Sequence, residues 1–376
     1  MKKLLSVFLC LVIIFPLSTS ALAAEPEMTL EQTVEFTALS FMQKSLDESI
    51  EISETTPFYD LENNITAYHI TFRLHDTPAG YVLISLLHPE TPIVEFAFEG
   101  SGLVETILKR QTNIDTRSSP TNKIYFLGDG ELYISYPNAS FQNVYTAQTV
   151  TTQKLTEYYQ EILSSSPMPI NSVDIRAGIL DWAKASIDQK SIVKIPNFGV
   201  GTDYWLLEDF DETGNVCAPT CATNILWYWG IQRGYHWVVQ VGTQSGKTLA
   251  TSIFNTMSSY MKTVPSLGTA DFMIPRAYKE FMGYRGSNFT LTSLTQNKYS
   301  DFTSAVDAGL PVHTMLRNTS AHSVGHDVMT LGYGKSTNGT QYLFVMDGWE
   351  DYGRFVIFNY YPIIKGISVE VGPTYK

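Results

Sequence analysis

One cysteine of the sequence stands where a thiol can become reactive. Residues 214–229 read GNVCAPTCATNILWYW, so an apolar, aromatic helix is expected to begin at Cys217. The positive end of a helix dipole and a neighbouring imidazolium can lower the pKa of a thiol from about 8.5 by several units. Pro219 suits such a helix start, where its missing N–H is not needed. Cys217 is therefore a candidate nucleophile, although this stretch alone equally allows a packed cysteine, as we expect for Cys221.

A histidine and an aspartate at the ends of two predicted strands favour the reactive interpretation. His326 precedes a predicted strand that ends in Gly-Tyr-Gly, and the next predicted strand, 341–346, runs into Asp347-Gly348-Trp349. A carboxylate at that position can accept the second ring proton of His326 and fix its tautomer. Trp349 could shield this hydrogen bond from water. The alternative for Asp347 is an ordinary Asp-Gly turn residue.

Other histidines lie close by in the sequence. His322 could be presented by the loop before His326, but a strand fixes a side chain more firmly than a loop. The two also have His-x-x-x-His spacing, which joins two rings on a helix, whereas a loop entering a strand is expected here. His313 lies on the preceding predicted strand. Because no third ligand is evident, we predict no metal and no other cofactor.

Taken together, these features resemble the papain-like cysteine peptidase superfamily, in its bacterial branch similar to bacteriocin-leader peptidases. The resemblance rests on Cys-x-Pro-Thr at a helix start, Gly-His-x-Val before Gly-Tyr-Gly, and Asp-Gly-Trp after the next strand. It implies Cys217 as nucleophile, His326 as general base and Asp347 as orienting acid. The implied fold class is α+β: a two-lobed catalytic domain whose helical half carries the cysteine and whose antiparallel β half carries the other two residues.

The implied reaction is hydrolysis of a peptide or protein substrate through a thioester acyl-enzyme. Members of the superfamily usually place a Gln shortly before the nucleophile to stabilise the oxyanion, and Asp211 holds that place here. A carboxylate would repel an oxyanion, so the donor would be Asn215 or the main-chain N–H of Cys217. A catalytically inactive binding module with the same scaffold is the alternative that Asp211 leaves open. An acyl transferase using the same triad is a further one.

The first 24 residues have the pattern of a secretory signal peptide. Two lysines precede the apolar stretch 4–17, and small residues follow it. This stretch is shorter than the ~20 residues that span a bilayer, which argues against a membrane anchor. Removal of the signal also removes Cys10. We expect a secreted, extracellular protein of a Gram-positive bacterium, with no membrane association afterwards.

Two globular units are predicted after the signal: residues 25–136 and the papain-like domain 196–376, joined by a connector, 137–195. The first unit begins with an amphipathic helix, 28–46. Strand-like segments separated by turn residues follow it, at 67–74, 80–86, 93–99 and in a hairpin at 124–136. We expect this unit to be a small α+β pro-region that covers the catalytic cleft until it is removed. In the connector, helices are expected at 151–163 and 178–189.

The composition argues against a disordered chain and against nucleic-acid binding. Apolar residues make up 44% of the chain and charged residues 16%, which is typical of a folded protein and not of a disordered one. The formal net charge is −12, and no basic run follows the N-terminus. Nucleic-acid binding is therefore not expected, because it requires Lys and Arg to neutralise phosphates.

Overall fold

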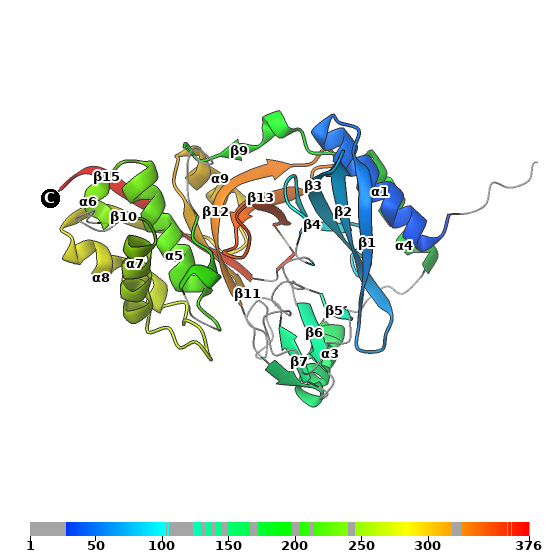
Figure 1. Ribbon diagram of the computed structural model, residues 1–376, viewed down its shortest axis with the longest axis horizontal. Coiled ribbons are helices and arrows are strands. Elements are labelled where there is room, and N and C mark those ends of the chain that lie inside the picture. The colour runs from blue at the N-terminus through cyan, green and yellow to red at the C-terminus, as the bar shows by residue number, and fades with distance from the viewer. Residues whose placement is uncertain are drawn as a thin grey trace, which may run out of the picture.

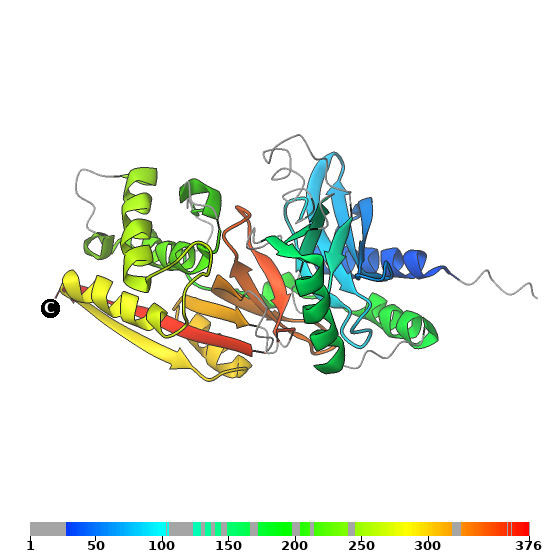
Figure 2. The ribbon, with the colours of Figure 1, turned by 90° about the horizontal axis from the view of Figure 1, so that it is seen from below.

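The computed structural model describes most of the chain after residue 27 (Figures 1 and 2). The described residues are 28–102, 104, 123–128, 132–136, 140–143, 149–165, 172–197, 204–210, 214–239, 245–317, 325–358, 360–361 and 363–375. The predicted signal peptide, Asp211 and His322 lie outside them. Within these ranges, no helix combines the length and the apolar character needed to cross a membrane.

The N-terminal unit packs a helix against antiparallel strands. α1 (Leu30–Leu46) begins with a capping box, in which Thr29 and Gln32 each accept a hydrogen bond from the main-chain N–H of the other. The strands are β1 (Glu51–Tyr59), β2 (Ile65–Leu74), β3 (Thr77–Ser85) and β4 (Ile93–Ala97), paired in that order. The predicted helix and three predicted strands are confirmed. β1 was not predicted, because its side chains are largely polar and only partly buried and give no clear alternation.

A smaller hairpin region extends this sheet. The predicted hairpin is formed by β5 (Ile124–Phe126) and β6 (Leu132–Tyr136). The elements β7 (Ser140–Asn143), β8 (Thr149–Thr151) and α3 (Thr152–Ser165) follow. Tyr158 and Tyr159 of α3 are buried in one apolar cluster with Tyr133. β5 also pairs in parallel with β1, which ties the region to the N-terminal sheet.

The connector contacts both units. It contains α4 (Ser172–Asp181), η1 (Trp182–Lys184), η2 (Gln189–Ser191) and β9 (Val193–Lys194). The predicted helix at 178–189 is therefore wrong in its extent, because the helical turns of α4 and η1 end at Lys184 and Ile187 forms a bridge to Ser336. α4 and η1 pack on α1, whereas β9 pairs with a strand of the C-terminal unit.

The C-terminal unit begins with a helical half. Its helical elements are η3 (Leu207–Phe210), α5 (Cys217–Trp227), η4 (Tyr228–Gln232), α6 (His236–Val239), α7 (Gly246–Met261) and α8 (Met273–Tyr284). Every side chain of α5 is buried, because this helix packs between α7 and the sheet strand β12. Its polar side chains, Thr220, Thr223 and Asn224, donate hydrogen bonds to main-chain oxygens, which allows their burial.

A mainly antiparallel β half completes the unit. Its elements are β10 (Ser287–Leu294), α9 (Tyr299–Asp307), β11 (Val312–Arg317), β12 (His326–Lys335), β13 (Gln341–Met346), β14 (Arg354–Ile357) and β15 (Ile363–Tyr375). The spatial order is β10-β15-β11-β12-β13-β14, with antiparallel neighbours throughout. The strands predicted before His326, after it and before Asp347 are confirmed as β11, β12 and β13.

The two units share one sheet. β14 pairs with β4, and Phe355 stacks on Phe96 with ring centroids 4.8 Å apart. The fifteen strands of the described residues thus form a continuous sheet in a mixed α/β structure. Figures 1 and 2 show the helical half at one end of the molecule, the N-terminal unit at the other, and strands β11 to β14 between them.

Candidate active site

Cys217 is the first residue of α5, as predicted, and the packing of this helix presents it to the β half. Val216 occupies the N-cap position, and its carbonyl accepts hydrogen bonds from the N–H and Oγ1 of Thr220 at 3.1 and 2.9 Å. Pro219 lies in the first turn, as expected. Because α5 packs on β12, its N-terminal cysteine meets the beginning of that strand.

The sulfur of Cys217 contacts a carboxylate that the sequence analysis did not consider. Its Sγ donates a hydrogen bond to Oδ2 of Asp327 over 3.6 Å. Burial and then the charge of Asp327 raise the pKa of the Cys217 thiol to about 12, against an opposing effect of Arg317. The expected lowering of this pKa is therefore wrong for this arrangement, since desolvation of the thiolate and the charge of Asp327 outweigh the effect of Arg317. At neutral pH the sulfur is a protonated thiol.

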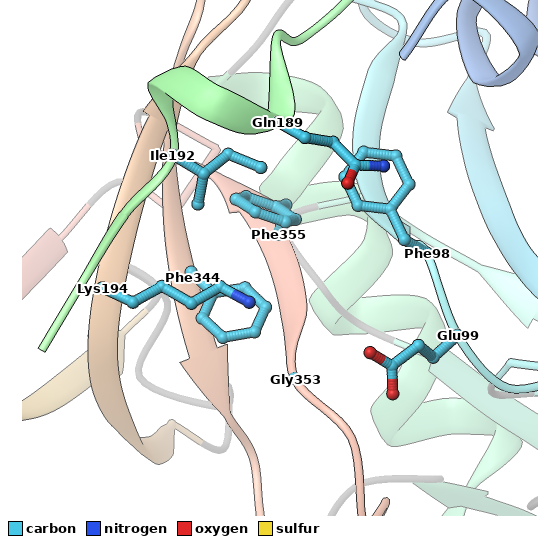
Figure 3. Close-up of a pocket in the computed structure, with 8 residues that line it drawn as sticks. All are labelled: Phe98, Glu99, Gln189, Ile192, Lys194, Phe344, Gly353 and Phe355. Carbon is cyan, nitrogen blue, oxygen red and sulfur yellow. The ribbon is translucent and has the colours of Figure 1, made fainter. Parts of the chain in front are cut away.

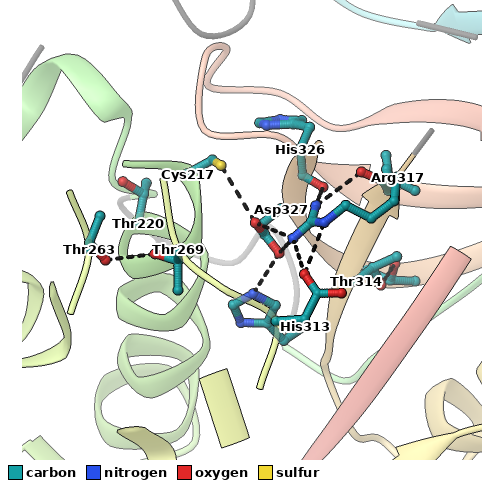
Figure 4. A network of polar contacts seen from close by, with 12 residues as sticks. Cys217, Thr220, Thr263, Thr269, His313, Thr314, Arg317, His326 and Asp327 are labelled. Carbon is teal, nitrogen blue, oxygen red and sulfur yellow. Dashed lines mark hydrogen bonds and ion pairs between the residues drawn. The ribbon is translucent and has the colours of Figure 1, made fainter. Parts of the chain in front are cut away.

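Asp327 is the second residue of β12 and the centre of a charged network (Figure 4). Nη2 of Arg317 lies 3.1 and 3.0 Å from its two carboxylate oxygens, and Nε2 of His313 lies 3.3 Å from Oδ1. Burial alone would raise the pKa of Asp327, but Arg317 and His313 hold it well below its ordinary range. Arg317 also pairs with Asp271 at 3.0 Å, and Asp271 pairs with Lys365 at 3.1 Å.

His326 begins β12, as predicted, and its ring stacks on that of Trp349 with centroids 4.0 Å apart and 11° between the planes. Figure 4 draws no hydrogen bond between this ring and the Cys217 sulfur. Burial lowers the pKa of His326 to about 3, although the charge of Asp347 acts to raise it. The imidazole is therefore neutral at pH 7, which is the form that can accept a proton.

Gly325 explains why a Gly-His step enters this strand. A Cβ at this position would lie 2.3 Å from Cδ of Arg317, which crosses over the glycine on its way to Asp327. Nη1 of Arg317 also donates to the main-chain oxygen of His326 at 3.1 Å. The missing side chain thus allows the guanidinium to lie beside both residues that begin β12.

Asp347 follows β13 directly, as predicted, and is both a turn residue and part of a charged site. Gly348 has φ of +83°, which permits the tight turn. This turn brings the N–H groups of Trp349 and Glu350 to Oδ1 of Asp347, at 2.8 and 3.4 Å. The other carboxylate oxygen, Oδ2, pairs with Nε of Arg354 at 2.9 Å.

Arg354 connects this turn to the N-terminal unit. Its Nη1 lies 2.6 Å from Oε2 of Glu95 on β4, and the two side chains are 4% and 8% exposed. The hydroxyl of Tyr81 on β3 donates to the other oxygen of Glu95. The guanidinium carbon lies 5.7 Å from the centre of the Trp349 ring, the same ring on which His326 stacks.

Among the remaining predicted residues, Asn215 is buried two positions before the nucleophile. Its N–H donates to the carbonyl of Pro265 at 2.8 Å, and its Oδ1 has no hydrogen-bond partner among the described residues. Because the oxygen and nitrogen of an amide are interchangeable by rotation, this position can hold a donor instead. Cys221 is buried and carries a free thiol. The described residues contain no group of three or more potential ligands that could hold a metal ion.

A separate cavity lies where the two units meet (Figure 3). Its volume is about 350 Å³, and residues from both units line it, among them Phe98, Glu99, Lys194 and Phe344. Nζ of Lys194 lies 4.2 Å from the centre of the Phe344 ring. Burial lowers the pKa of Lys194, while the charge of Glu99 opposes this. The lining residues do not include Cys217, His326 or Asp347, so this cavity is distinct from the candidate active site.

Sequence reasoning missed the charged partners of the site. Asp327 stands beside His326, and a charged residue at the start of an otherwise apolar strand was a usable signal for it. Arg317 at the end of β11 and Arg354 at the start of β14 are similar cases. Glu95 is also charged within an apolar strand, Ile-Val-Glu-Phe-Ala, but its partner lies in the other unit and no local pattern connects the two.

The C-terminal unit is similar to a known protein family. Residues 202–362, which contain all three residues of the predicted triad, match the model of the Peptidase_C39-like family. This match confirms that the region is similar to the papain-like cysteine peptidase superfamily. No curated protein sequence matches the chain significantly.

One solved structure with a weak likeness is a fragment of prointerpain A from Prevotella intermedia. The matched region covers 87% of this chain and 99% of the prointerpain A fragment, with 9% sequence identity and a TM-score of 0.42.

Proposed function

We propose that the protein is a cysteine peptidase in which Cys217 is the nucleophile, His326 the general base and Asp347 the orienting acid. The observation that carries the proposal is the contact between the start of α5 and the start of β12, where the Cys217 sulfur lies 3.6 Å from the residue that follows His326. The candidate nucleophile of the helical half thus lies beside the strand that carries the candidate base. The similarity of residues 202–362 to the Peptidase_C39-like family supports the same reaction class.

The proposed reaction begins from a neutral pair. His326 takes the proton of the Cys217 thiol as the sulfur attacks the carbonyl carbon of the peptide bond. The imidazolium then gives this proton to the leaving amine, the C–N bond breaks and a thioester remains. Water attacks the thioester while His326 accepts its proton, and the C–S bond breaks to release the acid and restore the thiol. Asp347 stabilises the imidazolium in both stages.

Two groups are available for the oxyanion of the tetrahedral intermediate. The main-chain N–H of Cys217 lies at the N-terminus of α5, where helix N–H groups have no partner within the helix. The amide of Asn215 can turn its nitrogen to the position of the unpartnered Oδ1. We propose these two donors in place of the glutamine that Asp211 replaces.

The second candidate function is a binding module without turnover. The observation that favours it is the pKa of Cys217, which is raised to about 12 where a catalytic thiolate would be expected to have a lowered one. In such a module the Cys217 hydrogen bond to Asp327 would be a permanent packing contact. The enzyme would instead use it as a resting state that a bound substrate replaces.

Alkylation with iodoacetamide tests the proposal on the intact chain. Cys221, which is also buried and free, serves as an internal control when the labelled cysteine is located by mass spectrometry. We expect Cys217 to react faster than Cys221 and to lose this advantage in His326→Ala. We also expect hydrolysis of fluorescently labelled casein that is lost in Cys217→Ala. Equal, slow labelling of both cysteines with no hydrolysis would favour the binding module.

We further propose that the protein is exported, and we consider two roles for its N-terminal unit. Its position between the predicted signal and the peptidase unit favours a removable pro-region, whereas the pairing of β4 with β14 favours a unit that remains in the active enzyme. The test is to cleave the secreted chain within 137–195, separate the fragments and compare casein hydrolysis before and after. An inhibitory pro-region predicts a gain in activity. No gain would contradict inhibition.

A further inference from the structure

The join between the two units contains a buried ion pair next to the candidate site. Glu95 lies in the middle of β4 and Arg354 begins β14, and the two strands pair with Val356 opposite Glu95. Removing charges from water is costly unless their partners are well placed, so a pair exposed by less than a tenth depends strongly on its geometry. Tyr81 fixes Glu95 from the other side through its hydroxyl.

Arg354 reaches two components of the candidate site. Its Nε pairs with Asp347, and its guanidinium lies over the face of Trp349. His326 stacks on the same indole. One side chain of the C-terminal unit therefore joins a carboxylate of the N-terminal unit to both the orienting acid and the ring support of the general base.

We infer that Glu95, although outside the peptidase-like region, is a positioning residue for the reaction, because it shares Arg354 with Asp347. This inference rests on the proposed function of Cys217, His326 and Asp347 and on the N-terminal unit remaining in the active enzyme. If Glu95 were neutral, the whole charge of Arg354 would act on Asp347, and this carboxylate would be less able to accept a hydrogen bond from His326. By binding Arg354, Glu95 leaves Asp347 available to the imidazole.

Charge supports the same role. The charged groups that act on His326 are Asp347, Arg354 on β14, Asp327 on β12 and Arg317 on β11, and the Cys217 thiol on α5 contacts the neighbouring Asp327. Arg354 lowers the pKa of His326, whereas Asp347 raises it. Neutralising Glu95 would leave the charge of Arg354 less compensated and would lower the pKa of His326 further.

The test compares two glutamates at the same junction in the intact chain. Glu95→Gln removes the buried charge with little change of shape. Glu99→Gln makes the same chemical change four residues later, where the side chain is exposed and lines the cavity of Figure 3. Both variants are assayed for casein hydrolysis and for Cys217 alkylation between pH 2 and 9, a range that includes the pKa of His326, and thermal unfolding checks their folding.

We expect Glu95→Gln to lower kcat on the order of tenfold with little change in KM, less than loss of the orienting carboxylate itself. Its acid limb of kcat/KM should move to lower pH, whereas Glu99→Gln should match the wild type in both. If wild type is active and Glu95→Gln behaves like Glu99→Gln, the inference is wrong and the proposed function stands. If wild type shows neither hydrolysis nor His326-dependent alkylation, the proposed function fails and the inference with it.

A second variant keeps the inference testable if Glu95→Gln does not fold. Glu95→Asp retains the charge but shortens the reach to Arg354. We expect it to lower kcat by a smaller factor than a neutral residue would and to leave the acid limb unchanged, because the charge remains. A kcat equal to wild type, or a shifted acid limb, would overturn the role of Glu95.

Discussion

Two arginines occupy similar positions on either side of the candidate site but differ in their surroundings. Arg317 lies between Asp327 and Asp271, and Arg354 lies between Asp347 and Glu95. The outer carboxylate of the first network, Asp271, is 34% exposed and belongs to the same unit, whereas Glu95 is 8% exposed and belongs to the other unit. Water can thus replace Asp271 as a partner of Arg317, whereas it cannot reach Arg354 to replace Glu95.

This difference in exposure indicates that the Arg317 network depends on solvation and that the Arg354 network depends on fixed geometry. The Asp327 carboxylate touches the sulfur directly and acts on the chemistry of the thiol, while its arginine remains partly accessible. The Asp347 network meets the imidazole through a stacked indole and a buried guanidinium, so its effect depends on fixed positions. We therefore expect the loss of unfolding free energy to differ when corresponding residues of the two networks are substituted.

Removal of Arg354 should have the largest effect. Arg354→Met leaves Glu95 and Asp347 as buried carboxylates without their shared cation, and we expect unfolding free energy to fall by about 3–5 kcal/mol. The measurement is urea unfolding followed by tryptophan fluorescence. Arg73→Met is the control, because Arg73 pairs with Glu51 at the surface, with side chains 49% and 71% exposed. Loss of such a surface pair should lower the unfolding free energy by at most about 1 kcal/mol. Similar losses in both variants would refute the buried network as a stabilising unit.

Acid pH should destabilise both units through their buried histidines. Burial lowers the pKa of His69 in the N-terminal unit and of His326 to about 3 in each case. Between pH 6.5 and 3 the unfolded chain binds more protons than the folded chain. For each histidine, the free energy of unfolding therefore falls by up to about 1.4 kcal/mol per unit as the pH falls. This stability is complete above pH 6.5.

The variant His69→Phe separates the two contributions. His69 stacks on Tyr81 and Phe58, with centroids 5.0 and 6.0 Å away, so an aromatic ring suits its place. We expect the slope of unfolding free energy against pH to fall in this variant while the slope from His326 remains. An unchanged slope would mean that His69 is not neutral in the folded chain.

Asp327→Asn tests the network that touches the sulfur. The change removes a charge that raises the pKa of Cys217 and leaves Arg317, which lowers it. We expect alkylation of Cys217 at pH 9 to accelerate about tenfold for each unit by which the thiol pKa falls. Labelling kinetics resolved by mass spectrometry measure it. Slower labelling would show that the carboxylate assists the thiol instead of restraining it.

The local sequence pattern predicted the helix and strands that carry the site. The charged partners of the site depend on tertiary contacts, which the pattern does not reveal. Cys217, His326 and Asp347 were placed at a helix start, a strand start and a strand end, because turn residues and apolar periodicity mark such boundaries. Their roles as a triad remain a prediction. The raised pKa of Cys217 was not foreseeable, because it depends on burial and on Asp327, which lies in the other half of the C-terminal unit. The join of β4 to β14 likewise depends on a pairing of distant strands that no spacing encodes.

The smallest effect is expected from Asp271→Asn, which breaks the outer pair of the Arg317 network. Arg317 keeps both contacts with Asp327, and water can replace the lost carboxylate because Asp271 is partly exposed. We expect a loss of at most about 1 kcal/mol in unfolding free energy and little change in Cys217 alkylation. Glu95→Gln, measured in the same urea titration, removes the corresponding outer carboxylate of the buried network. If Asp271→Asn cost as much as Glu95→Gln, exposure would not be what distinguishes the two networks, and the direct contact of Arg317 with Asp327 would depend on its outer partner as well.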